Sequence, residues 1–241
     1  TEGMLAWPPD PEAWSLRWYR NMIGDCSAEV VSSTVPCSTK WMKGTVNSFY
    51  IGIIATFIAT VLGTMAALGL SRPHMPYKAL IMSILISPMI VPLIITAAGM
   101  FFFYARINLV YTFTGVILAH VALATPFVVI TVTATLVGFD MNMVKAAQSL
   151  GAKPIRTFFK VIMPLILPGI ISGALFAFIT SFDEVVIVMF MASIDQLTIP
   201  KQMWAGIRQE ISPVILCMAT CLVILSIVLL TTVELLRRRS E

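Results

Sequence analysis

Long apolar segments that carry almost no charge constrain this chain more than any other feature. Each segment is longer than the roughly 20 residues needed to cross a hydrocarbon core about 30 Å thick. A β-barrel would instead show alternating segments of about ten residues. The sequence therefore predicts an all-α integral membrane protein, a polytopic helical bundle. Its five predicted spans are residues 48–70, 79–103, 113–137, 166–192 and 213–236.

The composition excludes the other broad classes of protein. Only 12% of the residues are charged and 58% are hydrophobic, whereas about a quarter of the residues of a soluble domain are charged. A disordered chain would be poor in apolar side chains. The net charge of +4 is not gathered on one face, as a nucleic-acid-binding surface requires. We therefore expect membrane lipid as a partner and no nucleic acid.

The distribution of lysine and arginine orients the predicted spans. Cytoplasmic loops carry the excess of these residues, and nine of them fall on the side of the C-terminus against seven on the other side. This places the C-terminus in the cytoplasm and residues 1–47 outside. Because such an outer segment needs a means of crossing the membrane, we expect a further helix before Thr1 and six spans in the intact protein.

The cysteines suggest a disulfide but no metal site. Cys26 and Cys37 lie in a polar, turn-rich stretch of the outer segment, and such a pair can form a disulfide in an oxidising compartment. Two free thiols are the alternative, and the sequence leaves both open. Cys217 and Cys221 lie one helical turn apart without an accompanying histidine, so packing within the last span is expected rather than metal binding.

The cytoplasmic loop of residues 138–165 has a helical pattern of its own. Gly151 supplies a left-handed stop for its first helix, and a second short helix is predicted over residues 155–163, with Pro164 ending it. The small residues of the first helix would let another surface approach closely, but a helix resting on lipid headgroups is equally consistent. In the first half of the loop, apolar or small residues recur at helical spacing and would share one helix face: Met143, Ala146, Ala147 and Leu150.

This loop resembles the "EAA" loop of the permease subunits of bacterial ABC importers. The matching pattern is Ala146-Ala147-x-x-x-Gly151, nine residues, and then Val161-x-Met163-Pro164. In that family the loop is the coupling helix that fits a groove in the ATP-hydrolysing subunit. The family's usual glutamate is lysine here, which leaves docking intact but calls any particular salt bridge into question. The resemblance implies coupling roles for Lys145, Ala146, Ala147, Leu150, Gly151, Ala152 and Pro164.

The resemblance extends along most of the chain. Residues 41–70, 87–92, 120–129, 181–186 and 197–213 are similar to the second permease of the spermidine/putrescine importers. This implies the type I importer permease fold, a multi-pass protein of the bacterial inner membrane, and a pore-forming subunit that is not an enzyme. The predicted domains are an extracytoplasmic segment 1–47, a transmembrane permease domain 48–236 with the coupling loop 138–165, and a cytoplasmic tail 237–241.

The same resemblance implies partner subunits. They are a second, homologous permease subunit, a dimer of ATP-binding subunits and a periplasmic solute-binding protein. The chain has no Gly-x-x-x-x-Gly-Lys-Ser/Thr phosphate-binding loop. ATP and magnesium are therefore expected on the ATPase, and no cofactor or metal on this chain.

Two adjacent acids inside the fourth window are candidate pathway residues. Asp183 and Glu184 lie well within the predicted span, where a charged side chain is costly unless it faces a cavity or a partner. Neighbouring residues on a helix point about 100° apart, so both can hardly face one cavity. A carboxylate there suits a cationic solute of polyamine type. Alternatively, one acid bonds to a neighbouring helix and the other pairs with a cation at the interface.

Other residues complete the candidate pathway. Ser181 and Phe182 precede the acids, and His120 is a secondary candidate, although a lone histidine is also consistent with a hydrogen bond between helices. Prolines interrupt helical hydrogen bonding, and such breaks either line a transport route or are packing kinks. Helix breaks are expected at Pro88, Pro92 and Pro126.

These observations predict the permease subunit of an ATP-driven importer. It would move a small cationic solute of polyamine type, spermidine or putrescine, across the inner membrane by alternating access. The alternative is the same role for an amino-acid-derived, opine-like or anionic solute. An intramembrane enzyme is disfavoured because His-Glu-x-x-His is absent, and a receptor or scaffold would leave the coupling loop unexplained.

Overall fold

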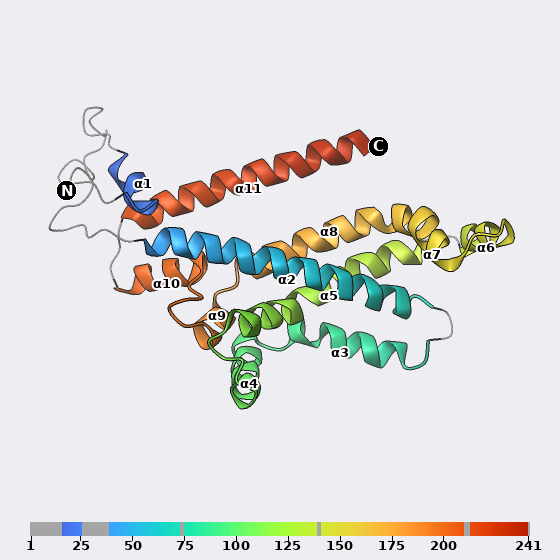
Figure 1. Cartoon of the computed structure of the whole chain (residues 1–241), viewed down its shortest axis with the longest axis horizontal. Coiled ribbons are helices and arrows are strands. Elements are labelled where there is room, and N and C mark those ends of the chain that lie inside the picture. The colour runs from blue at the N-terminus through green and yellow to red at the C-terminus, as the bar shows by residue number, and fades with distance from the viewer. Residues whose placement is uncertain (1–15, 26–38, 73–74, 139–140, 210–212, 241) are drawn as a thin grey trace. The chain divides into compact units, whose positions relative to one another are not determined.

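A computed structural model describes residues 16–25, 39–72, 75–138, 141–209 and 213–240 of the protein. Every regular element in these ranges is a helix (Figure 1), which agrees with the all-α class expected from the sequence. The contacts divide the chain into two units, one of residues 46–200 and one of residues 1–45 with 201–241. The first unit contains both the predicted coupling loop and the paired acids.

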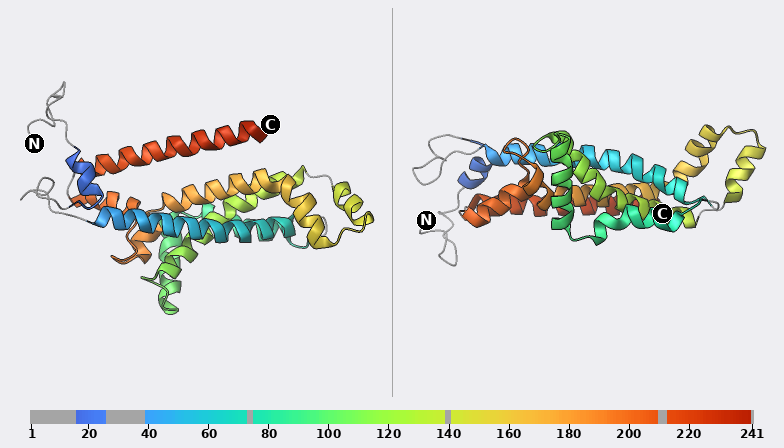
Figure 2. Two further views of the ribbon diagram at one scale, coloured as in Figure 1. Left: turned by 45° about the horizontal axis from the view of Figure 1, so that its top comes forward. Right: turned by 90° about the horizontal axis from the view of Figure 1, so that it is seen from below.

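Three long helices that run alongside one another form the body of the 46–200 unit (Figures 1 and 2). They are α2 (Lys40–Leu70), α5 (Phe113–Val137) and α8 (Met163–Phe182). At one end of α5 and α8 lie α6 (Met141–Ser149), α7 (Pro154–Thr157) and the π-helical turn η3 (Phe158–Ile162). Two shorter elements, α3 (Lys78–Ile90) and α4 (Leu93–Arg106), pack on α5 and on α9 (Val186–Met191), respectively.

The contact between α5 and α8 is close because α8 presents small residues to α5. A Cβ atom on Gly169 would collide with Thr135 Oγ1, and one on Gly173 would lie 3.0 Å from the backbone Cα of Val128. Small residues let helix backbones approach each other in a membrane, where helix association depends on van der Waals packing. The buried stripe on α8, which we call the α8 stripe, is Gly169, Gly173, Ala177 and Ser181.

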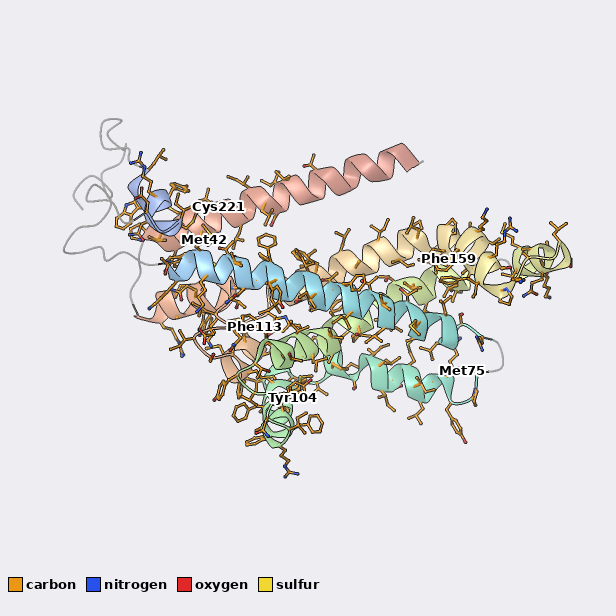
Figure 3. The ribbon with its side chains drawn as sticks, viewed as in Figure 1. Met42, Met75, Tyr104, Phe113, Phe159 and Cys221 are labelled. Atoms are coloured by element: carbon orange, nitrogen blue, oxygen red, sulfur yellow. The ribbon has the colours of Figure 1, made fainter. Side chains whose placement is uncertain are left out.

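Helix α2 approaches the same pair of helices through glycines. A Cβ atom on Gly63 would lie 2.6 Å from Val128 Cβ on α5, and one on Gly52 would lie 3.2 Å from the ring of Phe178 on α8. At the start of α5, Phe113 meets Tyr50 of α2 edge to face, with ring centroids 5.6 Å apart; Figure 3 labels Phe113. Helix α5 is therefore the central element of this unit.

The second window, 79–103, is not a straight span as predicted. It is divided between α3 and α4, which are bent by 104° at the break. Val91 is extended, with φ −70° and ψ 134°, because the ring of Pro92 disfavours the helical region for the residue before it. Pro88 does not break its helix, since Ser87 Oγ donates to Ile84 O at 2.8 Å. That is the carbonyl that the proline leaves without a backbone donor.

The third window, 113–137, coincides with α5. The break expected at Pro126 was wrong, because the helix continues through this proline. The flanking turns are held by contacts with α2 and α8, and Pro126 itself is buried. In a transmembrane bundle, packing of this kind allows a helix to tolerate the missing donor.

The fourth window, 166–192, begins and ends differently from the prediction. One continuous helix runs from Pro154 to Phe182, so Pro164 does not end the preceding helix. The N–H of Met163 bonds to Phe158 O in a π-helical turn, and the proline, which has no N–H to place, follows directly. A π-helical turn can accommodate the missing backbone donor of a proline without ending the helix. Beyond Phe182 the chain is non-helical until α9.

The other unit contains α1 (Arg17–Met22), most of α10 (Ile199–Gln209) and α11 (Pro213–Ser240). Helix α1 packs on α11, and α11 covers the fifth window, 213–236, of which the apolar stretch in the described residues is Pro213–Val228. Across the described ranges, three helices are long and apolar enough to cross a membrane, or four if α3 and α4 form one bent span. Of the five windows expected from the sequence, 79–103 is bent and 166–192 is broken after Phe182, whereas 113–137 is a single helix.

The close packing of α5 and α8 predicts a stability difference between two glycine variants. Gly173→Ala places a methyl group against Val128 Cα and Thr131 Oγ1, and overpacking of this kind costs about 1–3 kcal/mol. Gly99→Ala is the control, because a Cβ there meets nothing within 4 Å and both changes raise helix propensity alike. Thermal unfolding of the purified variants should show a lower melting temperature for Gly173→Ala alone. Equal melting temperatures would contradict the close contact.

Candidate functional site

The two acids of the fourth window lie in a break between helices, and not on a continuous helix as predicted. Asp183 ends α8, with its N–H bonded to Ile179 O at 3.0 Å. Glu184 Oε1 accepts the N–H of Ile187 at 2.9 Å and so caps the start of α9. Acidic side chains compete for free N–H groups at helix starts, which explains why the apolar window does not form one helix.

The break gives the adjacent acids different surroundings. Asp183 is exposed, whereas Glu184 is 7% exposed and is bonded to the backbone of α9. The prediction that both can hardly face one cavity rested on helical geometry that is absent here. The difference instead comes from the local hydrogen bonding of Glu184, and Asp183 is the carboxylate of this pair that remains open.

Phe182 and Ser181 hold the end of α8 in different ways. The ring of Phe182 lies 5.4 Å from that of Phe178 and 5.2 Å from that of Phe49 on α2. Ser181 Oγ lies 2.8 Å from His120 Nδ1 on α5, and both residues are buried. The Nε2 atom of His120 has no hydrogen-bond partner. The structure thus brings His120, Ser181 and Phe182 to the last turn before Asp183.

The far side of the break is fixed by residues that the sequence analysis missed. The N–H of Tyr111 bonds to Met191 O at 2.9 Å. Asn47 Nδ2 donates to Asp195 O at 2.8 Å and to Leu197 O at 2.9 Å. A polar residue directly before the first window was the only available signal, and it did not reveal a partner nearly 150 residues away. Helix α9 and the segment after it are therefore anchored independently of α8.

The predicted coupling loop is a helix with a defined end. Gly151 has φ +79°; its N–H bonds to Gln148 O at 2.9 Å, and that of Ala152 bonds to Ala147 O at 3.0 Å. These two bonds form the Schellman motif, which requires a left-handed residue at the glycine position. The left-handed stop expected at Gly151 is present. The predicted helix end at Pro164 is not, because the following helix continues into α8.

The coupling loop exposes apolar side chains. Leu150 is 89% exposed, Ile155 is 75% exposed and Phe159 is 60% exposed. Figure 3 labels Phe159 on this part of the chain. Lys145 and Ala146 are exposed, while Ala147 and Ala152 are partly buried. Exposed large apolar side chains of this kind are available to contact a partner surface or lipid headgroups.

Two further sequence predictions concern sites of other kinds. Cys26 and Cys37 lie outside the described residues, so their disulfide stays a prediction. In the part of the chain that the structure describes, no group of three or more His, Cys, Asp or Glu side chains could hold a metal ion.

Known proteins resemble this chain in sequence. The family described as "Binding-protein-dependent transport system inner membrane component" matches residues 59–241. The chain is 29% identical over 237 residues to "Spermidine/putrescine transport system permease protein PotC" of Haemophilus influenzae, covering 98% of this chain and 86% of that protein. It is 29% identical over 214 residues to "Putrescine transport system permease protein PotI" of Escherichia coli K12, covering 86% of this chain and 72% of that protein.

The fold also resembles a solved structure. A chain of the MetNI methionine ABC transporter in its inward-facing conformations superposes with a TM-score of 0.62 at 19% identity, covering 79% of this chain and 91% of that chain. This similarity concerns the fold alone. It agrees with the type I importer permease fold expected from the sequence.

The capping bond of Glu184 predicts a difference between two substitutions. Glu184→Gln keeps a carbonyl oxygen for the Ile187 N–H, whereas Glu184→Leu removes the acceptor. Loss of such a cap costs about 0.5–2 kcal/mol, so the leucine variant should unfold at a lower temperature and the glutamine variant close to the wild-type temperature. Thermal unfolding of the purified chains measures both. Equal stability of the leucine and wild-type proteins would show that Glu184 does not cap α9.

Proposed function

The chain belongs to the family of binding-protein-dependent transport system inner membrane components, and we propose that it is the permease subunit through which an ABC importer moves spermidine or putrescine. The polyamine permeases among its relatives support this solute class. The family assignment supports a multi-pass protein of the bacterial inner membrane that forms a pore and is not an enzyme.

The observation that carries the proposal is the exposed carboxylate of Asp183 in the break after α8. In transporters, irregular backbone within the membrane commonly lines the solute pathway. Polyamines are multiply cationic, and an open carboxylate attracts such a solute. Phe182 lies next to it and is partly exposed, and an aromatic face also attracts an ammonium group.

The coupling loop and the break are joined by one helix. The helix from Pro154 to Phe182 has 29 residues, which corresponds to about 44 Å at 1.5 Å per residue. A displacement of the coupling loop would thus reach the last turn before Asp183 through a single rod. This supports alternating access driven by ATP, with the ATP and its magnesium bound by a separate pair of ATPase subunits.

The remaining parts of the importer are also proposed. The coupling loop, with Leu150 and Ile155 exposed, would dock on the ATPase from the cytoplasm. The C-terminus, which follows this loop after two further predicted spans, would lie on the same side of the membrane. A second, homologous permease subunit would complete the pathway, because the spans of one subunit would line only half of it. A periplasmic binding protein would deliver the solute.

The role of Asp183 predicts a loss of polyamine uptake. In the importer assembled with its partner subunits, Asp183→Asn should lower uptake of labelled spermidine or putrescine by about tenfold, which corresponds to about 1.4 kcal/mol. The control is Asp195→Asn, because this residue is also an exposed acid but lies beyond α9. Undiminished uptake by an assembled Asp183→Asn importer would remove this residue from the pathway. Uptake of another solute by the wild-type importer in place of polyamines would favour the alternative solute classes.

The helix end at Gly151 predicts a coupling defect. Gly151→Val forces a β-branched residue to φ +79°, and strain of this kind costs about 1–3 kcal/mol. The variant should lose association with the ATPase and ATP-dependent uptake, measured by co-purification and transport. Gly99→Val is the control, because Gly99 lies in α4, outside the coupling loop, and a Cβ there meets nothing within 4 Å. Normal association and transport by Gly151→Val would contradict the coupling role.

A further inference from the structure

We propose that His120 is a positioning residue for transport: by bonding to Ser181 it fixes the last turn of α8 and thereby the direction of the Asp183 carboxylate. The inference rests on the proposed function, because it assigns a role in the same solute pathway. It differs from the sequence hypothesis that His120 itself meets the solute.

The burial of His120 favours an indirect role. The side chain is 1% exposed and lies on α5, the helix that contacts both α2 and α8. A group without an exposed surface does not touch a solute in this conformation. Its one hydrogen bond runs from Nδ1 to Ser181 Oγ, 2.8 Å away. Whichever ring nitrogen carries the proton, the serine hydroxyl can donate or accept accordingly.

The unpartnered Nε2 atom indicates that this histidine does more than fill space in the core. A buried polar atom without a partner is unfavourable, and Nε2 has none. An apolar residue of similar size would avoid this cost. The cost of burying Nε2 is therefore explained if the hydrogen bond from Nδ1 to Ser181 Oγ has a role that an apolar side chain could not fill.

The bond acts at the point where α8 ends. Ser181 is the last residue of the α8 stripe and the only one with a polar side chain. Asp183 follows two residues later, and its N–H bonds to Ile179 O, so it belongs to the same final turn. Rotation of this turn would redirect the Asp183 carboxylate, and the bond from His120 to Ser181 opposes that rotation.

The hydrogen bonds on the α9 side of the break do not hold the end of α8. Glu184 caps α9 through Ile187, and Tyr111 holds Met191 at the end of α9. These bonds fix α9, which begins after Asp183. Loss of the bond between His120 and Ser181 would therefore leave the end of α8 held by the ring of Phe182 against Phe49 and free to rotate further, while α9 stays in place.

Two isosteric substitutions test which edge of the imidazole matters. An asparagine side chain places a polar atom near the position of Nδ1, whereas a glutamine places one near Nε2. In the assembled importer, we expect His120→Asn to keep most polyamine uptake and His120→Gln to lose about tenfold, as should Ser181→Ala. Uptake is normalised to the amount of assembled complex, and thermal unfolding of each variant is measured beside it.

A double-mutant cycle distinguishes positioning of Asp183 from a contribution of His120 to stability alone. The quantity measured is the effect of Ser181→Ala on uptake in two backgrounds. If His120 and Ser181 act through Asp183, Ser181→Ala should lower uptake about tenfold in the wild-type background but leave it unchanged in the Asp183→Asn background. Equal uptake by the asparagine and glutamine variants, preserved uptake by His120→Gln alone, or additive effects of Ser181→Ala and Asp183→Asn would each overturn the inference. Absence of polyamine uptake by the wild-type importer would instead refute the proposed function, and the inference with it.

Discussion

The close approach of α5 and α8 is the contact on which the rest of the 46–200 unit depends. In a membrane, lipid tails are as apolar as leucine, so helices associate by fitting closely rather than by escaping water. Gly169 and Gly173 leave no room for a Cβ against α5, and Gly63 of α2 leaves little beside Val128. One buried face of α5 therefore receives two neighbours, and the position of α8 follows from this fit.

This fit holds the continuous helix from Pro154 to Phe182, of which α8 is the larger part, as a rod whose two ends are defined by polar groups. At one end, the Schellman motif around Gly151 closes α6 and lets the chain turn into the continuous helix that begins at Pro154. At the other end, Ser181 is held by His120 and Glu184 opens the next helix. Apolar packing sets where the rod lies, while these few hydrogen bonds set where it starts and stops.

The sequence predicted those features that depend on local signals. The window 113–137 coincides with α5, because its apolar run is bounded by Thr112, whose side chain accepts the N–H of Gly115. Gly151 was identified as a helix stop from its local context. The break at Asp183 was missed, because average hydropathy does not reveal that a neighbouring carboxylate will take an N–H group. The bond between His120 and Ser181 joins residues 61 positions apart, and no local pattern indicates it.

The contrast between Asp183 and Glu184 shows how a membrane protein separates structural from functional charge. Within lipid, each polar group must be satisfied by the protein or lie at a water-filled surface. Glu184 is buried and meets the first condition through the backbone of α9, whereas Asp183 is exposed. A sequence shows two equivalent acids in succession, and only the helix end between them makes one a cap and leaves the other open. The chemistry available to a cation at this position therefore depends on where α8 stops.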